Sequence, residues 1–135
     1  MADTLHLEIV TPERLVEKDT VEEVQIPGKN GYLGVLPGHA PLITELGIGE
    51  IIYQVNRLTR RIAVAWGFAE VLPDKVTILA ETAERAVDID IERARKAKQR
   101  AEERLRTASG EVDYQRALDS LERANSRLDV AEGSK

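Results

Sequence analysis

The composition of the chain changes abruptly near residue 88, and this change limits what each part can fold into. All five prolines and seven of the nine glycines precede Val87. Residues 88–135 contain no proline and only Gly110 and Gly133. Because proline and glycine interrupt helices, nothing in the second segment prevents long helices. We therefore expect two domains, residues 1–87 and residues 88–135.

The charged side chains divide in the same way. Residues 1–87 carry 13 acidic and 8 basic side chains, whereas residues 88–135 carry 11 of each, so the net charge of −5 belongs to the first domain. A highly charged but neutral segment is typical of helices with paired charges, and differs from a basic arm that binds nucleic acid. Nucleic acid is not expected as a partner.

Several function classes are excluded by residues that the chain lacks. It has no cysteine, and its two histidines, His6 and His39, stand in no spacing typical of metal ligands. We find no nucleophile–base pair, so we expect no metal site, no catalytic residues and no enzyme. No signal sequence is recognisable, and no apolar run approaches the roughly 18 residues needed to cross a bilayer. Direct membrane insertion is not expected.

The first domain shows the spacing of an all-β structure. Eight candidate strands recur along it, at residues 4–10, 21–26, 31–36, 41–46, 51–55, 61–66, 68–72 and 76–80. Turn signals such as Pro27-Gly28 and Pro73-Asp74 separate them. This rhythm predicts an antiparallel sandwich or barrel and disfavours alternating strands and helices.

The second domain shows helical spacing. Alanine, leucine and isoleucine recur every three or four residues in two series, which predict a helix at about 90–107 and a second helix after Gly110 with Asp113 as its candidate N-cap. The predicted fold class is α+β, with an N-terminal antiparallel β-sandwich followed by a C-terminal αα-hairpin. Because the first stripe is mostly alanine, it buries little area, and we expect shallow, reversible packing.

Three separated motifs carry a resemblance to a known family. They are GYLGVLPGHAPLIT at residues 31–44, GFAEVLPDKVTILAETAER at residues 67–85 and DIDIERA at residues 88–94. Together they resemble the epsilon subunit of bacterial F-type ATP synthases over essentially the whole chain. The resemblance implies a sandwich of about ten strands and a two-helix domain. It also implies a non-catalytic rotor subunit of the central stalk, peripheral to the cytoplasmic face of the cell membrane.

The same resemblance implies partners and contact residues. The partners are the gamma subunit, the c-subunit ring and, when the hairpin is extended, the alpha/beta catalytic head. Such a subunit couples proton flow to ATP synthesis, and its hairpin inhibits ATP hydrolysis. The turn of Lys29, Asn30, Gly31 and Tyr32 is expected to face the c ring, and His39 to face gamma. Relatives often carry an acidic residue in place of Tyr32, so we hypothesise an aromatic contact with the ring.

A regulatory nucleotide is also implied by the resemblance, although no cofactor is required. Ile89, Asp90, Arg93 and Ala94 match an Ile/Leu-Asp-x-x-Arg-Ala motif with which some members bind one ATP. The nucleotide is expected to bind either with or without magnesium, and the sequence leaves both alternatives open. Asp90 and Glu84 are expected near the base or ribose.

The spacing of four arginines adds an argument of its own. Arg93 and Arg100 share one helix face, Arg123 and Arg127 share another, and an antiparallel hairpin is expected to set Arg93 near the level of Arg127. Four guanidinium groups would then converge on one triphosphate. The alternative is a solvated helix surface on which these arginines pair with neighbouring carboxylates.

A second function class stays open at this point. The chain would then be a stand-alone module, in which a sandwich with a helical hairpin senses nucleotide or acts as an adaptor for another partner. Such a module would be a stable free monomer without affinity for a gamma subunit.

Overall fold

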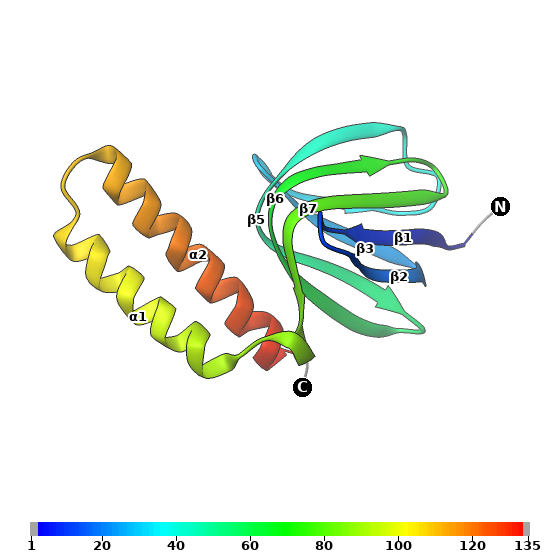
Figure 1. The fold of residues 1–135 in the computed structure, drawn as a ribbon. Helices are drawn as coiled ribbons and strands as arrows, with labels where there is room; N and C mark the ends of the chain where they lie inside the picture. Colours follow the sequence, from blue (N-terminus) through cyan, green and yellow to red (C-terminus); the bar gives the residue numbers. More distant parts are fainter. Residues whose placement is uncertain (1–2, 134–135) are drawn as a thin grey trace.

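The computed structural model describes residues 3–133, which form a β-sheet domain with a helical hairpin extending from one end (Figure 1). The strands are β1 (Leu5–Val10), β2 (Leu15–Val21), β3 (Glu23–Gly28), β4 (Gly31–Val35), β5 (Leu42–Val55), β6 (Leu58–Val71) and β7 (Lys75–Arg85). A single 3-10 turn, η1 (Ala86–Asp88), leads to α1 (Ile91–Thr107) and α2 (Glu111–Gly133). Strands therefore precede helices, and the predicted α+β class is confirmed.

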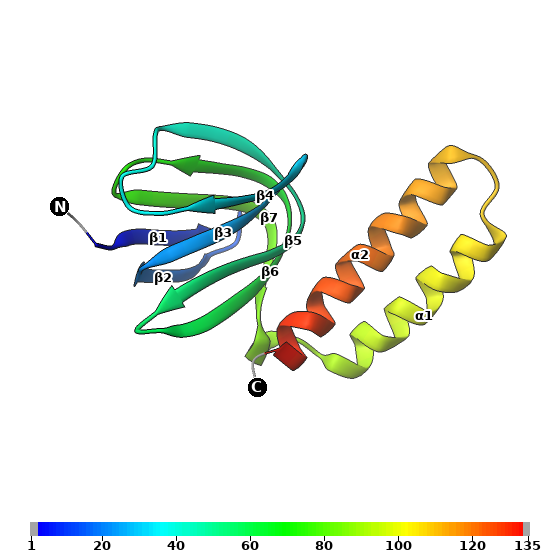
Figure 2. The same cartoon turned by 180° about the vertical axis from the view of Figure 1, so that it is seen from behind.

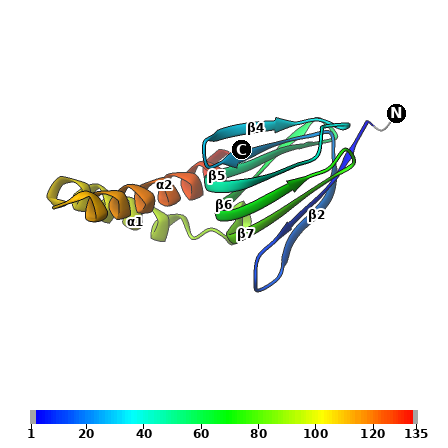
Figure 3. The same ribbon diagram turned by 90° about the horizontal axis from the view of Figure 1, so that it is seen from above.

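The strands form one sheet in the order β2-β1-β7-β6-β5-β3-β4. All neighbours are antiparallel except β1 and β7, which are parallel. The sheet curls so that β2 also contacts β5, a strand far from it in this order (Figure 2, Figure 3). One apolar core fills the curled sheet, and every strand contributes to it, as Leu7, Ile26, Ile51 and Ile78 illustrate.

The described residues contain seven strands, fewer than the ten or so that we expected. Two pairs of expected strands are continuous, because 41–46 and 51–55 both lie in β5, and 61–66 and 68–72 both lie in β6. The glycines between the paired segments, Gly47 and Gly49 in β5 and Gly67 in β6, bend these strands without ending them. Trp66 and Gly67 have φ angles of 57° and 117°, so β6 changes direction there while its pairing continues.

One strand and one cap position differ from the sequence prediction. β2 was not predicted, because its polar sequence LVEKDTV buries only Val16 and Val21 and shows no regular alternation of apolar residues. The expected N-cap of the second helix is wrong: α2 begins at Glu111, which places Asp113 inside its first turn. The start of the first helix agrees with the motif, since Asp90 is its N-cap and accepts a hydrogen bond from the Arg93 backbone N–H at 3.1 Å.

The two helices pack through small side chains. Ala94 and Ala101 of α1 and Ala117 and Ala124 of α2 are buried, and in each helix they are seven residues apart. Methyl groups let two helices approach closely but remove little apolar area from water. α2 lies between α1 and the sheet, and its contacts with the sheet are mainly with β5 and β6 (Figure 1, Figure 2). Within residues 3–133, neither helix has the length and apolarity of a membrane span.

The bend in β6 generates a stability prediction. A Cβ atom at Gly67 would lie 2.0 Å from the Leu79 carbonyl oxygen, and the residue has a positive φ. Gly67→Ala should therefore lower the free energy of unfolding by about 1 to 3 kcal/mol from backbone strain alone. Urea unfolding followed by circular dichroism measures this change.

Gly34→Ala is the matched control, because no atom lies within 4 Å of its added Cβ. We expect a change within about 0.5 kcal/mol for this surface position. Equal unfolding midpoints for the two variants would show that the bend at Gly67 tolerates a side chain.

Candidate functional site

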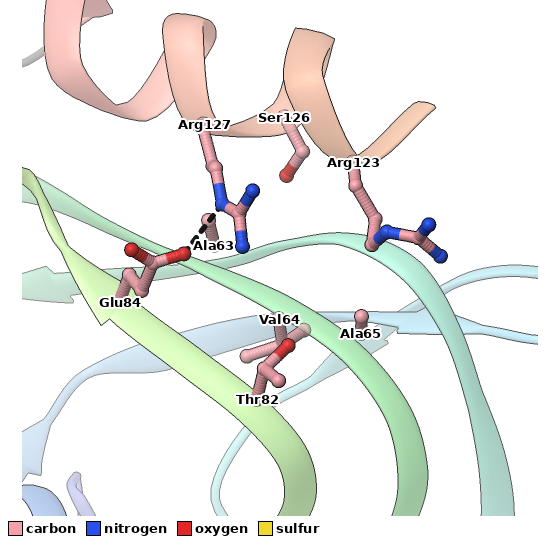
Figure 4. Close-up of a pocket in the computed structure, with 8 residues that line it drawn as sticks. All are labelled: Ala63, Val64, Ala65, Thr82, Glu84, Arg123, Ser126 and Arg127. Atoms are coloured by element: carbon pink, nitrogen blue, oxygen red, sulfur yellow. Dashed lines mark hydrogen bonds and ion pairs between the residues drawn. The ribbon is translucent and has the colours of Figure 1, made fainter. Parts of the chain in front are cut away.

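The surface that receives α2 is the outer face of the sheet, and its centre consists of small residues. Ala63 and Ala65 of β6 are buried beneath the helix (Figure 4). Ala63 is paired with Glu50 of β5 on one side and with Glu84 of β7 on the other. Cross-strand partners share a face of the sheet. α2 therefore lies over an alanine floor that is bordered by two carboxyl groups.

Two polar contacts attach α2 to this floor. The Ser126 hydroxyl donates a buried hydrogen bond of 2.7 Å to the Gly49 carbonyl oxygen. Arg127 Nε donates to Glu84 Oε1 at 2.5 Å, and both side chains are about one-third exposed (Figure 4). The register between β3 and β5 shifts in the stretch of β5 that includes Gly49, so the Ser126 bond is made where the ladder is irregular.

A small apolar cluster completes the attachment. Ala63, Ile89 and Val130 are buried together, with Ala86 and Ala131 packed against them. These residues come from the sheet, the connection after η1 and the end of α2. The hairpin is thus fixed by its connection and by one face of α2.

Glu50 is the least expected member of the site. Its side chain is only 8 % exposed, and Oε2 accepts a hydrogen bond from Arg61 Nη1 at 3.1 Å. The other carboxyl oxygen, Oε1, is buried and has no hydrogen-bond partner among the described residues. Burial raises the pKa of Glu50, the Arg61 charge opposes this, and Asp129 of α2 raises it further. No signal in the sequence pairs Glu50 with Arg61, because their contact depends on the register between β5 and β6.

The structure places the predicted nucleotide residues in two groups. Glu84 and Arg127 are joined by their ion pair, and Arg123 lies beside them at the same gap between α2 and the sheet (Figure 4). Arg93 and Arg100 are exposed on α1. Of the four arginines, Arg123 and Arg127 line this gap.

The remaining predicted residues act locally in the fold. Asp90 caps α1, while Ile89 and Ala94 are buried in apolar contacts. The gap between α2 and the sheet has a volume of about 10 Å³, which is room for one water molecule. A triphosphate at this gap therefore requires Arg127 to leave Glu84. The nucleotide site stays a prediction.

The two helices run antiparallel, so the start of α1 lies beside the end of α2 (Figure 1). Arg95 Nη2 and Glu132 Oε1 form an ion pair of 3.5 Å at this end of the hairpin. Both side chains are long enough to reach along the helix axes, so this pair does not fix the level of Arg93 relative to Arg127. The expected proximity of Arg93 and Arg127 stays a prediction.

The turn predicted to face a ring of subunits lies between β3 and β4, at the end of the sheet nearest the hairpin (Figure 2). Lys29 Nζ and Glu45 Oε2 form an ion pair of 3.2 Å, and Gly31 has a φ of 134° that favours glycine. The Tyr32 side chain is 56 % exposed, yet its hydroxyl accepts a 3.0 Å hydrogen bond from the Glu50 N–H. Asn30 is exposed at the tip of the turn.

His39 lies in the connection between β4 and β5, at the opposite end of the sheet and beside the β6–β7 turn (Figure 1). Its Nδ1 and the Ala40 carbonyl oxygen are 2.7 Å apart. Beyond this connection, the outer face of the sheet exposes three large apolar side chains: Ile43 at 69 %, Phe68 at 52 % and Leu79 at 52 %. Phe68 and Leu79 are cross-strand partners, so these side chains form one apolar patch, which sequence analysis did not identify.

No group of three or more histidine, aspartate or glutamate side chains that could hold a metal ion occurs in the part of the chain that the structure describes. Glutamates here pair with arginine or lysine, as Glu50, Glu84 and Glu45 do. The polar contacts of this surface are therefore ion pairs between carboxylates and basic side chains.

Comparisons with known proteins agree on one family. The family described as ATP synthase, Delta/Epsilon chain, beta-sandwich domain matches residues 4–86, and the family described as ATP synthase, Delta/Epsilon chain, long alpha-helix domain matches residues 88–132. The ATP synthase epsilon chain of Koribacter versatilis (strain Ellin345) is 68 % identical over 111 residues, which cover 82 % of this chain and 78 % of the relative. That of Nitratidesulfovibrio vulgaris (strain DP4) is 56 % identical over 105 residues, covering 78 % of each.

A solved structure shares the fold. A chain in the cryo-EM structure of the Euglena gracilis mitochondrial ATP synthase, with OSCP, F1 and c-ring in rotational state 1, superposes with a TM-score of 0.81. It covers 98 % of this chain and 83 % of the other at 21 % identity. At that identity the match establishes the arrangement of sheet and hairpin alone.

The buried hydroxyl at the site generates a prediction about docking. Ser126→Ala removes the hydrogen bond to the Gly49 carbonyl and leaves that acceptor under the helix, which should weaken docking of α2 by about 1 to 3 kcal/mol. Hydrogen–deuterium exchange of the α2 amides in the full chain measures the change as a loss of protection.

Ser120→Ala serves as the control, because the Ser120 hydroxyl is bonded within α2, to Arg123 at 3.2 Å. Its α2 amides should exchange at the wild-type rate. If Ser126→Ala and Ser120→Ala exchange alike, the bond to Gly49 does not hold the hairpin.

Proposed function

The chain belongs to the ATP synthase delta/epsilon chain family, and from this premise we propose that it contacts gamma and the c ring in the central stalk while its hairpin regulates ATP hydrolysis. It is a non-catalytic epsilon subunit of an F-type ATP synthase and associates with other subunits of that membrane-associated complex. The high identity to an epsilon chain favours this role over a stand-alone sensor or adaptor module.

The proposed gamma contact is the His39 end of the sheet. Ile43, Phe68 and Leu79 expose a contiguous apolar patch there, and exposed apolar patches of soluble proteins commonly mark protein interfaces. Aromatic residues such as Phe68 are enriched at interface centres, with polar residues such as His39 at the rim. The patch therefore supports a protein partner at this end.

The proposed c-ring contact is the turn of Lys29, Asn30, Gly31 and Tyr32. This turn lies at the other end of the sheet from His39, so both partners fit on one domain at once (Figure 1). Tyr32 supplies an exposed aromatic ring whose hydroxyl is fixed by the Glu50 N–H. On this proposal the subunit is peripheral to the cytoplasmic face of the membrane.

The observation that carries the regulatory proposal is the shallow attachment of the hairpin. α2 is held by one buried hydrogen bond from Ser126, by the partly exposed Arg127–Glu84 ion pair and by a cluster around Val130. Partly exposed ion pairs add little stability, and small apolar clusters add a few kcal/mol before ordering costs. A partner or ligand that binds the undocked hairpin can overcome such an attachment. The extended hairpin would then reach the alpha/beta head and inhibit hydrolysis.

A regulatory ATP fits the same proposal. Arg93 and Arg100 on α1 and Arg123 and Arg127 on α2 supply guanidinium groups, which bind phosphate oxygens in pairs. Arg127 would exchange Glu84 for a phosphate, so nucleotide binding and hairpin docking would affect each other. Bound ATP would favour the folded hairpin and so relieve inhibition. ATP would bind either with or without magnesium.

Removal of the hairpin tests the regulatory role. Truncation after Val87 should raise the rate of ATP hydrolysis by the assembled enzyme, because the inhibiting helices are gone, while the sheet domain still binds gamma. The steady-state hydrolysis rate and the subunit content of the purified complex are measured together. An unchanged rate in a fully assembled complex would contradict inhibition by the hairpin, and loss of the truncated subunit from the complex would contradict attachment through the sheet.

Arginine substitutions test the nucleotide site. Arg93→Ala and Arg127→Ala should each abolish the rise in melting temperature that ATP causes in the full chain, since each removes a phosphate ligand. Arg116→Ala is the control, because Arg116 is an exposed α2 arginine outside the predicted set. Titration calorimetry with and without magnesium gives the stoichiometry. An ATP-induced shift that persists in both variants would remove these arginines from the site.

A further inference from the structure

Two buried polar side chains mark the contact between α2 and the sheet. Within residues 3–133, Glu50 and Ser126 are the only polar or charged side chains that are buried, at 8 % and 7 % exposure. Ser126 has its hydrogen bond to Gly49, whereas Glu50 Oε1 has no hydrogen-bond partner among the described residues. Burying a charged group is unfavourable unless its atoms are fully paired. The Glu50 carboxylate is therefore under-compensated in the docked arrangement.

Arg61 connects this carboxyl group to the end of α2. Its Nη1 lies 3.1 Å from Glu50 Oε2, and a Cβ atom at Gly133 would lie 3.6 Å from Arg61 Cδ and Nε. α2 has no basic residue in its own last turn. A cation near the C-terminus of a helix is favourable because the last carbonyl groups carry partial negative charge. Arg61 thus pairs with the Glu50 carboxylate and lies beside the C-terminal end of α2.

The titratable groups around Glu50 come from three elements. β6 contributes Arg61, β4 contributes the Tyr32 hydroxyl, and α2 contributes Asp129. Burial raises the pKa of Glu50 most, the Arg61 charge lowers it, and the Asp129 charge raises it again. Two of the causes that raise the pKa of Glu50, namely its burial and the charge of Asp129, depend on the docking of α2.

The other charged groups that α2 presents to the sheet are Arg123 and Arg127. Both lie at the gap bordered by Thr82 and Glu84 of β7, with the β6 alanines between this gap and β5 (Figure 4). Arg127 is engaged by Glu84. Arg61 is therefore the only cation that the structure places in contact with Glu50 among the described residues.

We propose that Glu50, held by Arg61 and covered by α2, is a proton-dependent latch, so that the hairpin docks more tightly when the carboxyl group is protonated and neutral. Docking buries the group against Asp129, and a neutral carboxyl bears this burial at lower cost than a carboxylate. Protonation also gives Glu50 an O–H donor and leaves Arg61 available to the end of α2.

The direction of the pH dependence follows from linkage. The docked state holds the Glu50 proton more tightly than the open state, where the carboxyl group is solvated and its pKa is the ordinary glutamate value of about 4.5. The extra docking stability is complete below that value and is lost as the pH rises through the raised pKa of the docked state. Each unit of difference between the two pKa values changes the docking equilibrium about tenfold.

The test is hydrogen–deuterium exchange of the free full-length chain, read as α2 protection factors between pH 4.5 and 8. Protection factors are corrected for intrinsic exchange rates, so the remaining pH dependence reports docking. Wild-type α2 protection should fall, relative to that of the sheet core, as the pH rises. Glu50→Gln, which is neutral and nearly isosteric, should protect α2 more than wild type at pH 7.5 and should lose the pH dependence.

Asp129→Asn is the second variant, and it leaves Glu50 in place. It should reduce the pH dependence and increase protection at pH 7.5, because the like charge is gone. Glu122→Gln is the control, since Glu122 is an exposed α2 carboxylate away from Glu50, and its profile should match wild type. A Glu50→Gln profile that superimposes on wild type, or lower protection in this variant at pH 7.5, would overturn the proposal. The measurement needs no other subunit, so its result is independent of the hairpin's role in the complex.

Discussion

The close approach of α2 to β6 is the contact on which the position of the whole hairpin depends. The helix comes near the sheet because Ala63 and Ala65 form the floor beneath it. Alanine side chains allow a close approach but bury little apolar area, so the hydrophobic effect alone holds the hairpin weakly. The attachment therefore depends more on polar contacts, namely the Ser126 hydrogen bond and the Arg127–Glu84 ion pair.

The sheet domain has the opposite character. Its core takes buried side chains from every strand, and its long strands β5 and β6 continue through their bends instead of breaking. The strained pair Trp66 and Gly67 is tolerated because pairing on both sides fixes the backbone there. A sheet domain with an extensive apolar core is thus joined to a hairpin that is attached through few contacts, and the two parts differ in what holds them together.

The sequence predicted the architecture better than it predicted the site. Composition and spacing were sufficient for the α+β class, and the three motifs at residues 31–44, 67–85 and 88–94 identified the family, which the family matches confirm. The spacing divided β5 and β6 into two strands each, because glycines that bend a strand resemble glycines that end one. Glu50 and Arg61 could not be found, because they meet only through the register of β5 and β6 and the position of the last turn of α2. Such offsets are set by packing and not by periodicity.

One peptide group joins β4 to α2. The N–H between Gly49 and Glu50 donates to the Tyr32 hydroxyl, and the C=O of the same peptide accepts from Ser126. A Cβ at Gly49 would lie 2.7 Å from the Tyr32 oxygen, so only glycine allows the ring to lie there. Hydrogen bonds to opposite ends of one peptide polarise each other. The peptide plane cannot rotate without weakening both bonds, so the orientation of this one peptide fixes both the Tyr32 side chain and the Ser126 contact of α2.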